Sequence, residues 1–266
     1  MSLEKTTGPN LVAVSVGNTR ITVARVESGR IESSDRFALD DLDSAVARVR
    51  DHWSAVEDLE AASILIASVN REVYAPLLAR LKQQAPSNRI FRVGVDLPIP
   101  IGRQLDEDAT PGDDRLLNAA AAFDKLQQAC VIIDAGSAVT VDFVDGQGTF
   151  HGGAILPGAR MQLKAMHEGT SQLPSLSFEP PEPDWFAPNT RQSMLHGVYY
   201  GIRGAVRFLI ERYAEGYQAY PRIIATGGDA HTLFDDDELI ETIVDDLTIF
   251  GIAATARVAL TADHES

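Results

Sequence analysis

The sequence contains almost no cysteine, since Cys130 is the only one among 266 residues. A single thiol excludes an internal disulfide and a zinc site made of cysteines. Cys130 begins an apolar run and is therefore expected to be a small core residue. The 6 histidines include no pair spaced four residues apart on an expected helix, so a histidine-based metal site is not expected.

Long apolar runs are also missing. None approaches the ~18 residues that a membrane-spanning helix needs. The segment Met1–Asn10 is polar and has no apolar stretch of the kind found in a signal peptide. These observations predict a cytoplasmic protein without a membrane partner.

The sequence also has no excess of positive charge, because its formal net charge is -15. Non-specific binding of nucleic acid depends on neutralising phosphates, so no nucleic-acid partner is expected. A small anionic ligand is not excluded, since local donors decide its binding. The densest acidic run, residues 235–238, is expected to be a solvated surface segment.

The most prominent motif of the sequence is a strand–turn–strand pattern over residues 131–142, which is followed by a turn at 145–148. An apolar strand ends in Asp134, and Gly136 and Ser137 then form a tight bend. A carboxylate and a hydroxyl beside a bend lined with N–H groups suit a phosphate and its counter-ion.

The same pattern occurs earlier in the chain, over residues 11–23. The two segments align without gaps when Ser15 is set against Asp134, Gly17 against Gly136 and Asn18 against Ser137. This repetition predicts a duplicated α/β unit. A chance likeness between two strand–glycine–strand segments remains the alternative.

Hydrophobic periodicity predicts mixed sheets with helices packed on them. The length and the 45% apolar content allow two domains of ordinary size or one large one. The first half is predicted to hold strands over 11–23, 31–37, 62–69 and 89–93, and helices over 39–53, 73–84 and 116–123. The second half is predicted to hold strands from 130 to 156 and over 222–225, and helices over 159–167, 190–213 and 247–260, with a proline-rich loop over 169–189.

Six short motifs occur in order along the chain: Val16-Gly17-Asn18-Thr19, Gly112-Asp113-Asp114-Arg115, residues 134–142, residues 152–158, Asn189-Thr190 and Thr226-Gly227-Gly228. Their order and spacing resemble those of the type III pantothenate kinase family, which belongs to the superfamily of acetate and sugar kinases, heat-shock ATPases and actin. The resemblance implies an α/β fold with two ribonuclease-H-like (actin-like ATPase) halves, 10–128 and 129–262, and a nucleotide cleft between them. It also implies a homodimer that uses ATP, Mg2+ and a monovalent cation (K+ or NH4+) to phosphorylate pantothenate to 4'-phosphopantothenate, the first step of coenzyme A biosynthesis.

The resemblance also implies roles for individual residues. Asp114 would be the general base, and Asp134 would ligate the monovalent cation. ATP would be bound by Ser15, Gly17, Asn18, Thr19, Gly136, Ser137, Gly227 and Gly228. Pantothenate would be bound by Leu105, Gly112, Asp113, Asp114, Arg115 and Thr190.

Phosphoryl transfer fits these residue types, because it mainly requires positioning of ATP, charge neutralisation and orientation of the acceptor hydroxyl. A carboxylate such as Asp114 can accept the proton of a primary alcohol. Each assignment has a structural alternative. Asp113 or Asp114 could cap the following helix, Asp134 could hold its hairpin turn, and Asn189-Thr190 could be an ordinary helix cap.

The chain departs from the family pattern at three positions. Ser15 stands where the family has an aspartate expected to hold Mg2+, Leu105 where it has a tyrosine over pantothenate, and Ser137 where it has threonine. Ser137 keeps the hydroxyl, whereas Ser15 has no charge for a metal. Three functions therefore stay open: a pantothenate kinase whose Mg2+ is held by phosphates and another carboxylate such as Asp142, a kinase for another small alcohol, or a non-catalytic regulatory homodimer that binds nucleotide or pantothenate.

Overall fold

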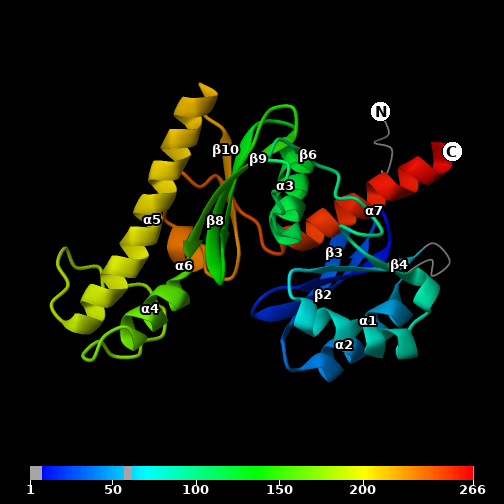
Figure 1. The fold of residues 1–266 in the computed structure, drawn as a ribbon, viewed down its shortest axis with the longest axis horizontal. Helices are drawn as coiled ribbons and strands as arrows, with labels where there is room; N and C mark the ends of the chain where they lie inside the picture. Colours follow the sequence, from blue (N-terminus) through cyan, green and yellow to red (C-terminus); the bar gives the residue numbers. More distant parts are fainter. Residues whose placement is uncertain (1–7, 57–61, 266) are drawn as a thin grey trace. The chain divides into compact units, whose positions relative to one another are not determined.

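Both strand–turn–strand segments form antiparallel hairpins at the centre of a sheet in the computed structural model, which describes residues 8–56 and 62–265 (Figure 1). The contacts divide the chain into two units. Unit 1 comprises residues up to 102, 108–124 and 247 onwards, and unit 2 comprises 103–107 and 125–246. The N-terminal segment, which was expected not to be a signal peptide, lies largely outside the described residues.

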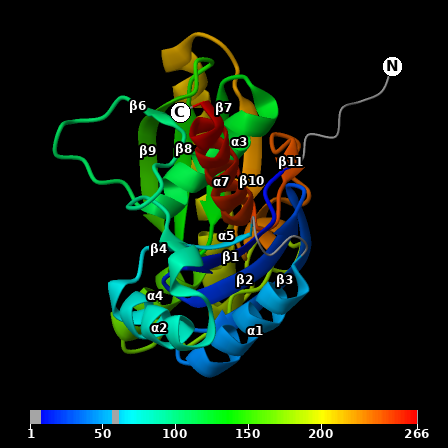
Figure 2. The ribbon, with the colours of Figure 1, turned by 90° about the vertical axis from the view of Figure 1, so that its right-hand side faces the viewer.

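Unit 1 is built on a sheet with the strand order β3-β2-β1-β4-β5. Strand β1 is antiparallel to β2 and parallel to β4, and its apolar side chains are buried on both faces. Figure 1 shows α1 and α2 on one side of this sheet and α7 on the other, and Figure 2 shows β1, β2 and β3 from a second direction. The elements are β1 (Leu11–Val16), β2 (Arg20–Glu27), β3 (Arg30–Ala38), α1 (Leu42–Ala55), β4 (Ser63–Ser68), α2 (Arg71–Gln84), η1 (Ser87–Arg89), β5 (Ile90–Arg92), α3 (Asp113–Leu126) and α7 (Leu247–Glu265).

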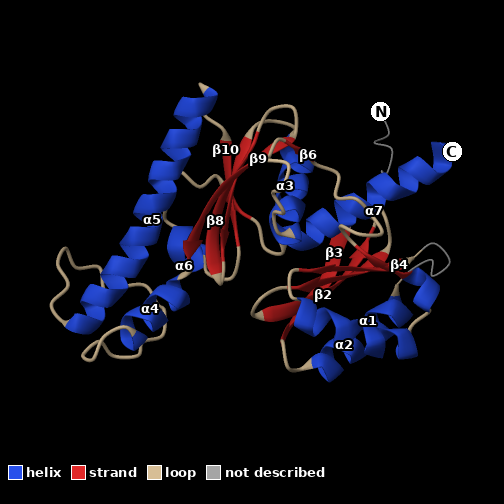
Figure 3. Ribbon diagram, viewed as in Figure 1, coloured by secondary structure: helices blue, strands red, loops and turns tan. Residues whose placement is uncertain are grey.

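Unit 2 is built on a sheet with the strand order β11-β10-β7-β8-β9-β6. Its core joins the sheet to the apolar stripe of α5, where Val198, Ile202 and Val206 are buried. Figure 3 shows α4, α5 and α6 on one side of this sheet. The elements are β6 (Gly102–Arg103), β7 (Cys130–Ala135), β8 (Ala138–Val144), β9 (Thr149–Pro157), α4 (Ala159–Glu168), α5 (Thr190–Tyr217), β10 (Arg222–Thr226), α6 (Ala230–Phe234) and β11 (Thr242–Ile243).

The topology confirms that the α/β unit is duplicated. The order β3-β2-β1-β4-β5 of unit 1 recurs in unit 2 as β9-β8-β7-β10-β11, with the short β6 added at the β9 edge. The gapless alignment holds only as far as the turn. Ser15 pairs with Thr22, whereas Asp134 pairs with Thr140, so the first turn is one residue longer and the second strands are displaced by one position.

The last helix belongs to unit 1, so the units differ from the predicted halves 10–128 and 129–262. Helix α7 packs on β1 and β4. A Cβ at Gly251 would lie 2.3 Å from the carbonyl oxygen of Leu117, so this glycine allows α7 to approach α3 closely. The apolar pattern of α7 shows that it is buried, but it does not specify which sheet covers it.

Two predictions about polarity have different outcomes. Cys130 is fully buried, and burial raises the pKa of its thiol to about 12, which confirms a core residue. The acidic run 235–238 is only partly a solvated surface, because the side chain of Asp237 is 7% exposed and pairs with Arg203 and Arg207. Among the described residues no helix is long and apolar enough to cross a membrane.

Candidate functional site

The first expected phosphate loop is the connection between β1 and β2 in unit 1. Gly17 donates its N–H to the carbonyl oxygen of Arg20 at 3.0 Å, which closes the hairpin. Asn18 and Thr19 are exposed at the tip, and Ser15 is half-buried at the end of β1. The N–H of Gly17 is therefore used within the turn, and a phosphate at this loop would face the residues of its tip.

Val69 connects this hairpin with the segment Gly112–Arg115. It donates its N–H to the carbonyl oxygen of Val16 at 3.1 Å, and its Cγ1 lies 3.7 Å from the position that a Cβ would take at Gly112. The same Cβ position lies 2.5 Å from Oδ1 of Asp114. Glycine at 112 therefore leaves room for the Asp114 carboxylate beside the hairpin.

Asp113 and Asp114 are the first two residues of α3, so neither precedes the helix as a conventional cap. Oδ1 of Asp114 accepts a hydrogen bond from the N–H of Arg115 at 2.8 Å. Burial raises the pKa of Asp114 above the ordinary value, and this effect outweighs the hydrogen bond and the positive charge of Arg115. A desolvated carboxylate with a raised pKa is a stronger proton acceptor than an exposed one.

Asp113 has a different setting. Its carboxylate lies against Gly94, where a Cβ would be 2.9 Å from Oδ1, and Gly94 has a φ of +82°. The turn at Gly94 is closed by its N–H, which donates to the carbonyl oxygen of Leu97 at 2.8 Å. The two neighbouring aspartates are thus held differently: Asp113 packs on the turn after β5, and Asp114 faces Gly112.

The second expected phosphate loop is the β7–β8 turn of unit 2. Gly136 donates its N–H to the carbonyl oxygen of Ala138 at 2.9 Å, as Gly17 does in the first hairpin. Asp134, at the end of β7, is half-buried between Thr140 on β8 and Thr226 on β10.

Gly227 lies directly against this turn. Its φ is +100°, and a Cβ there would be 2.4 Å from the carbonyl oxygen of Ala135 and 2.5 Å from Oδ1 of Asp134. Both the backbone conformation and the space therefore require glycine. The Asp134 carboxylate consequently lies beside the Gly227 backbone, at the carboxyl ends of β7 and β10.

A third segment completes a cluster that we call the three-loop cluster (residues 136–137, 157–160 and 226–229). A Cβ at Gly158 would lie 2.3 Å from the carbonyl oxygen of Gly136, and the N–H of Gly158 donates to the carbonyl oxygen of Ser137 at 3.2 Å. Arg160 and Asp229 form an ion pair in this cluster. Sequence reasoning assigned no role to these three residues, although Gly158 ends a quoted glycine motif and Asp229 follows another.

Leu105 and Thr190 lie elsewhere in unit 2. Leu105 is half-buried beside β9, where a Cβ at Gly152 would be 3.3 Å from its Cδ2. Thr190 is the exposed first residue of α5. The residue that caps α5 is Asn189, whose side chain accepts the N–H of Gln192 at 3.0 Å. The predicted cap is confirmed, and Thr190 is left with its side chain exposed.

The structure thus sorts the predicted residues into two groups, each within one unit. Unit 1 holds Ser15, Gly17, Asn18, Thr19, Gly112, Asp113, Asp114 and Arg115. Unit 2 holds Leu105, Asp134, Gly136, Ser137, Thr190, Gly227 and Gly228, of which Asp134, Gly136 and Gly227 are in close contact.

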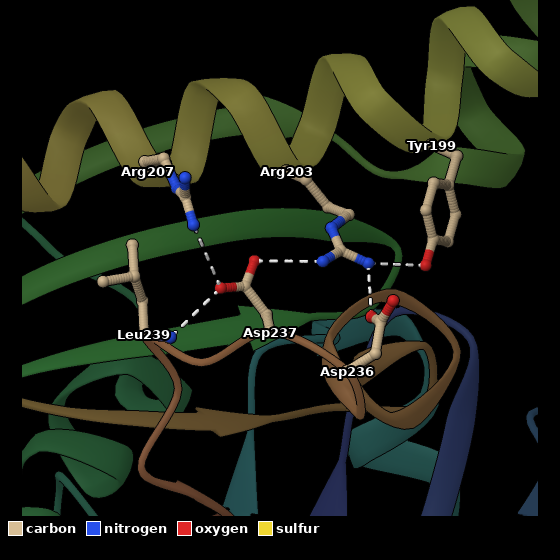
Figure 4. A network of polar contacts seen from close by, with 6 residues as sticks. All are labelled: Tyr199, Arg203, Arg207, Asp236, Asp237 and Leu239. Carbon is tan, nitrogen blue, oxygen red and sulfur yellow. Dashed lines mark hydrogen bonds and ion pairs between the residues drawn. The ribbon is translucent and has the colours of Figure 1, made fainter. Parts of the chain in front are cut away.

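A pocket of about 480 Å³ lies beside α5, and none of the predicted site residues lines it. Figure 4 shows its polar wall: Arg203 contacts Tyr199, Asp236 and Asp237, and Arg207 contacts Asp237. Because both arginines are paired with carboxylates, the pocket presents no uncompensated positive charge to a phosphate. The network attaches α5 to the segment after α6.

The structural comparisons confirm the fold class. A conserved Baf-family protein from Campylobacter jejuni superposes with a TM-score of 0.60 at 20% identity, covering 94% of this chain and 99% of that one. The activator of 2-hydroxyisocaproyl-CoA dehydratase from Clostridium difficile, solved with bound ADPNP, superposes with a TM-score of 0.56 at 11% identity, covering 97% and 98%. The chain has the α/β fold of the actin-like ATPases, with mixed sheets flanked by helices.

Sequence comparisons extend over most of the chain. The type III pantothenate kinase of Rhodospirillum rubrum is 38% identical over 162 residues, which cover 61% of this chain and 63% of that protein. The type III pantothenate kinase of Rubrobacter xylanophilus is 32% identical over 257 residues, which cover 91% of this chain and 95% of that protein. The family model of type III pantothenate kinase matches residues 11–212. The chain belongs to the type III pantothenate kinase family.

Proposed function

We propose that this protein transfers the γ-phosphoryl group of ATP to pantothenate and forms 4'-phosphopantothenate, the first step of coenzyme A biosynthesis. The observation that carries the proposal, beside the family, is the carboxylate of Asp114. It is desolvated, has a raised pKa and lies beside Gly112, next to the first hairpin. Asp114 accepts the proton of the acceptor hydroxyl as its oxygen bonds to phosphorus, the bond between the γ-phosphorus and the bridging oxygen breaks, and ADP leaves.

The three-loop cluster fits a nucleotide phosphate. Gly227 lacks the side chain that would obstruct the turn at Gly136, and its backbone lies beside the carboxylate of Asp134. We assign Gly136, Ser137, Gly227 and Gly228 to ATP, together with the hairpin residues Ser15, Gly17, Asn18 and Thr19. A backbone without side chains allows close approach of a phosphate.

The carboxylates present determine how metal ions would be held. No group of three or more His, Cys, Asp or Glu side chains suited to a metal occurs among the described residues. Mg2+ in kinases is usually held by substrate phosphates, waters and one or two carboxylates, so such a group is not needed. Asp142 is a poor ligand for a hydrated ion, because it is 2% exposed and packs against Gly153. We assign K+ or NH4+ to Asp134.

We assign the binding of pantothenate to Gly112, Asp113, Asp114 and Arg115, together with Leu105 and Thr190. Leu105 offers an apolar contact where the family has an aromatic ring, and Thr190 offers an exposed hydroxyl. We propose the cytoplasm as the location of this activity.

A coupled ADP-release assay tests the function. Turnover is expected to require pantothenate and Mg2+, and to be much faster with K+ or NH4+ than with Na+ alone. The controls omit pantothenate, Mg2+ or the enzyme. ADP release with another small alcohol in place of pantothenate would support the second function left open. Calorimetric binding of ATP or pantothenate without any turnover would support the non-catalytic alternative and contradict the proposed kinase.

We also propose that the protein is a homodimer joined through the outer face of α5. Gly197, Gly201 and Gly204 are exposed on this face, and a Cβ at each would meet no atom within 4 Å. Tyr200 and Phe208, on the same helix, are 51% and 63% exposed. Glycine within a helix costs about 0.5–1 kcal/mol relative to alanine, and exposed apolar side chains that gather on one face mark an interaction site.

Substituting leucine at Gly201 tests this interface. The native protein is expected to have twice the chain mass of 28.8 kDa, and Gly201→Leu is expected to have the mass of one chain, since the added side chain separates the two helices. Gly216→Leu is the matched control, because it lies on the same helix with equally open surroundings. Light scattering coupled to size-exclusion chromatography measures both. A dimeric Gly201→Leu variant would show that α5 does not form the interface through this face.

A further inference from the structure

The pair formed by Arg160 and Asp229 belongs to the three-loop cluster of unit 2. Arg160 lies in the first turn of α4, and Asp229 directly precedes α6. Nη1 of Arg160 is 2.6 Å from Oδ2 of Asp229. The pair therefore connects the segment after β9 with the segment after β10, on the two sides of the β7–β8 turn.

The two partners differ sharply in exposure. The side chain of Asp229 is 4% exposed, whereas that of Arg160 is 68% exposed. A buried carboxylate must be compensated by a positive charge or by hydrogen bonds, since removing its partner leaves an unpaired charge in a poorly solvated place. Within the described part of the chain, Arg160 is the compensating group for this carboxylate.

Backbone contacts connect the ion pair with the proposed nucleotide site. The N–H of Asp229 donates to the carbonyl oxygen of Ala135 at 2.9 Å, directly before the Gly136 turn. Gly227 is in contact with the same carbonyl oxygen, and Gly158 is in contact with Gly136. Holding Asp229 in place therefore holds both glycine backbones against the turn.

We propose that Arg160 and Asp229 act as a clamp that positions the Gly227-Gly228 backbone for the phosphates of ATP. This inference rests on the proposed function, since it assigns a positioning role within its nucleotide site. Gly227 has no side chain and a positive φ, and its backbone packs closely against the carbonyl oxygen of Ala135. The ion pair holds Asp229, two residues further along the chain, so that this packing is in place before the nucleotide binds, and preorganisation of that kind raises affinity.

Removing the positive charge measures the effect of the clamp. Arg160→Gln is expected to raise the dissociation constant of ATP roughly tenfold, which corresponds to ~1.4 kcal/mol. The KM for pantothenate and kcat at saturating ATP are expected to stay unchanged, because neither pantothenate binding nor the proton transfer is assigned to Arg160. Calorimetry gives the ATP affinity without requiring turnover, and Arg160→Lys is expected to restore most of it by returning a charge to Asp229.

Arg222→Gln is the matched control. Arg222 pairs with Glu241 at 2.5 Å at the opposite end of β10, so its loss removes an ion pair from the same strand away from the glycines, and the carboxylate left behind is 36% exposed. The ATP affinity of the Arg222→Gln variant is expected to equal that of the native protein.

The double variant Arg160→Gln/Asp229→Asn separates positioning from simple destabilisation. It leaves no uncompensated buried charge, so a clamp predicts that ATP affinity stays as low as in the single variant. Recovery of native affinity in the double variant would overturn the clamp, as would unchanged affinity in Arg160→Gln. A native protein that binds no ATP would overturn the proposed function together with the clamp, so the two failures are distinguishable.

Discussion

Asp114→Asn is expected to lower kcat by about 10²–10⁴-fold, the usual contribution of a positioned general base. Asparagine has the size of aspartate but cannot accept the proton of the pantothenate hydroxyl. Binding of ATP, which is assigned to other residues, is expected to be retained. Steady-state kinetics and calorimetry measure the two effects separately.

The same variant is expected to fold at least as stably as the native protein at neutral pH. Burial raises the pKa of Asp114, so the ionised form is less favourable in the folded than in the unfolded state. A neutral side chain removes that penalty above the raised pKa. Asp43→Asn is a suitable control, because this carboxylate is 92% exposed on α1 and takes no part in the proposed site. Native turnover in Asp114→Asn would remove Asp114 from the mechanism.

The raised pKa also sets the pH dependence of the native enzyme. The base is active when it is ionised, and its ionised fraction falls as the pH decreases through the raised pKa. The acid limb of kcat/KM, which reports the free enzyme, is therefore expected at a pH above the ordinary aspartate value of 3.8.

Gly227→Ala is expected to have the second largest effect, with loss of ATP binding and a decrease of about 2–4 kcal/mol in the free energy of unfolding. The residue has a φ of +100°, and the added Cβ would lie 2.4 Å from the carbonyl oxygen of Ala135. The contact is with backbone in the middle of the sheet, so a side-chain rotation cannot relieve it. Urea unfolding followed by circular dichroism, together with ATP titration, measures the change.

Gly216→Ala is the matched control for this substitution. It lies in α5, and a Cβ there would meet no atom within 4 Å. Alanine is a better helix former, so stability is expected to rise by about 0.5–1 kcal/mol. If Gly227→Ala had native stability and native ATP affinity, the described geometry of the β10–α6 connection could not be correct.

Local patterns in the chain predicted most of the helices and strands. The cap of α5 at Asn189 follows from its own side chain, which binds the N–H of Gln192 within one turn. The burial of β1 and β7 follows from their apolar runs, and the duplicated topology follows from two hairpins that each have a glycine at the turn. The short strands β6 and β11 were missed because so few residues show no clear period.

By itself, the sequence determined the fold class, the duplicated unit and the family, because these depend on short-range patterns and on residue identity. Only the tertiary structure decided that α7 packs in unit 1, that the Asp114 carboxylate is desolvated, that Gly227 has no room for a side chain and that Arg160 reaches Asp229. Each of these depends on contacts between residues far apart in the chain. Such contacts form only when several elements pack at once, and no local pattern records them.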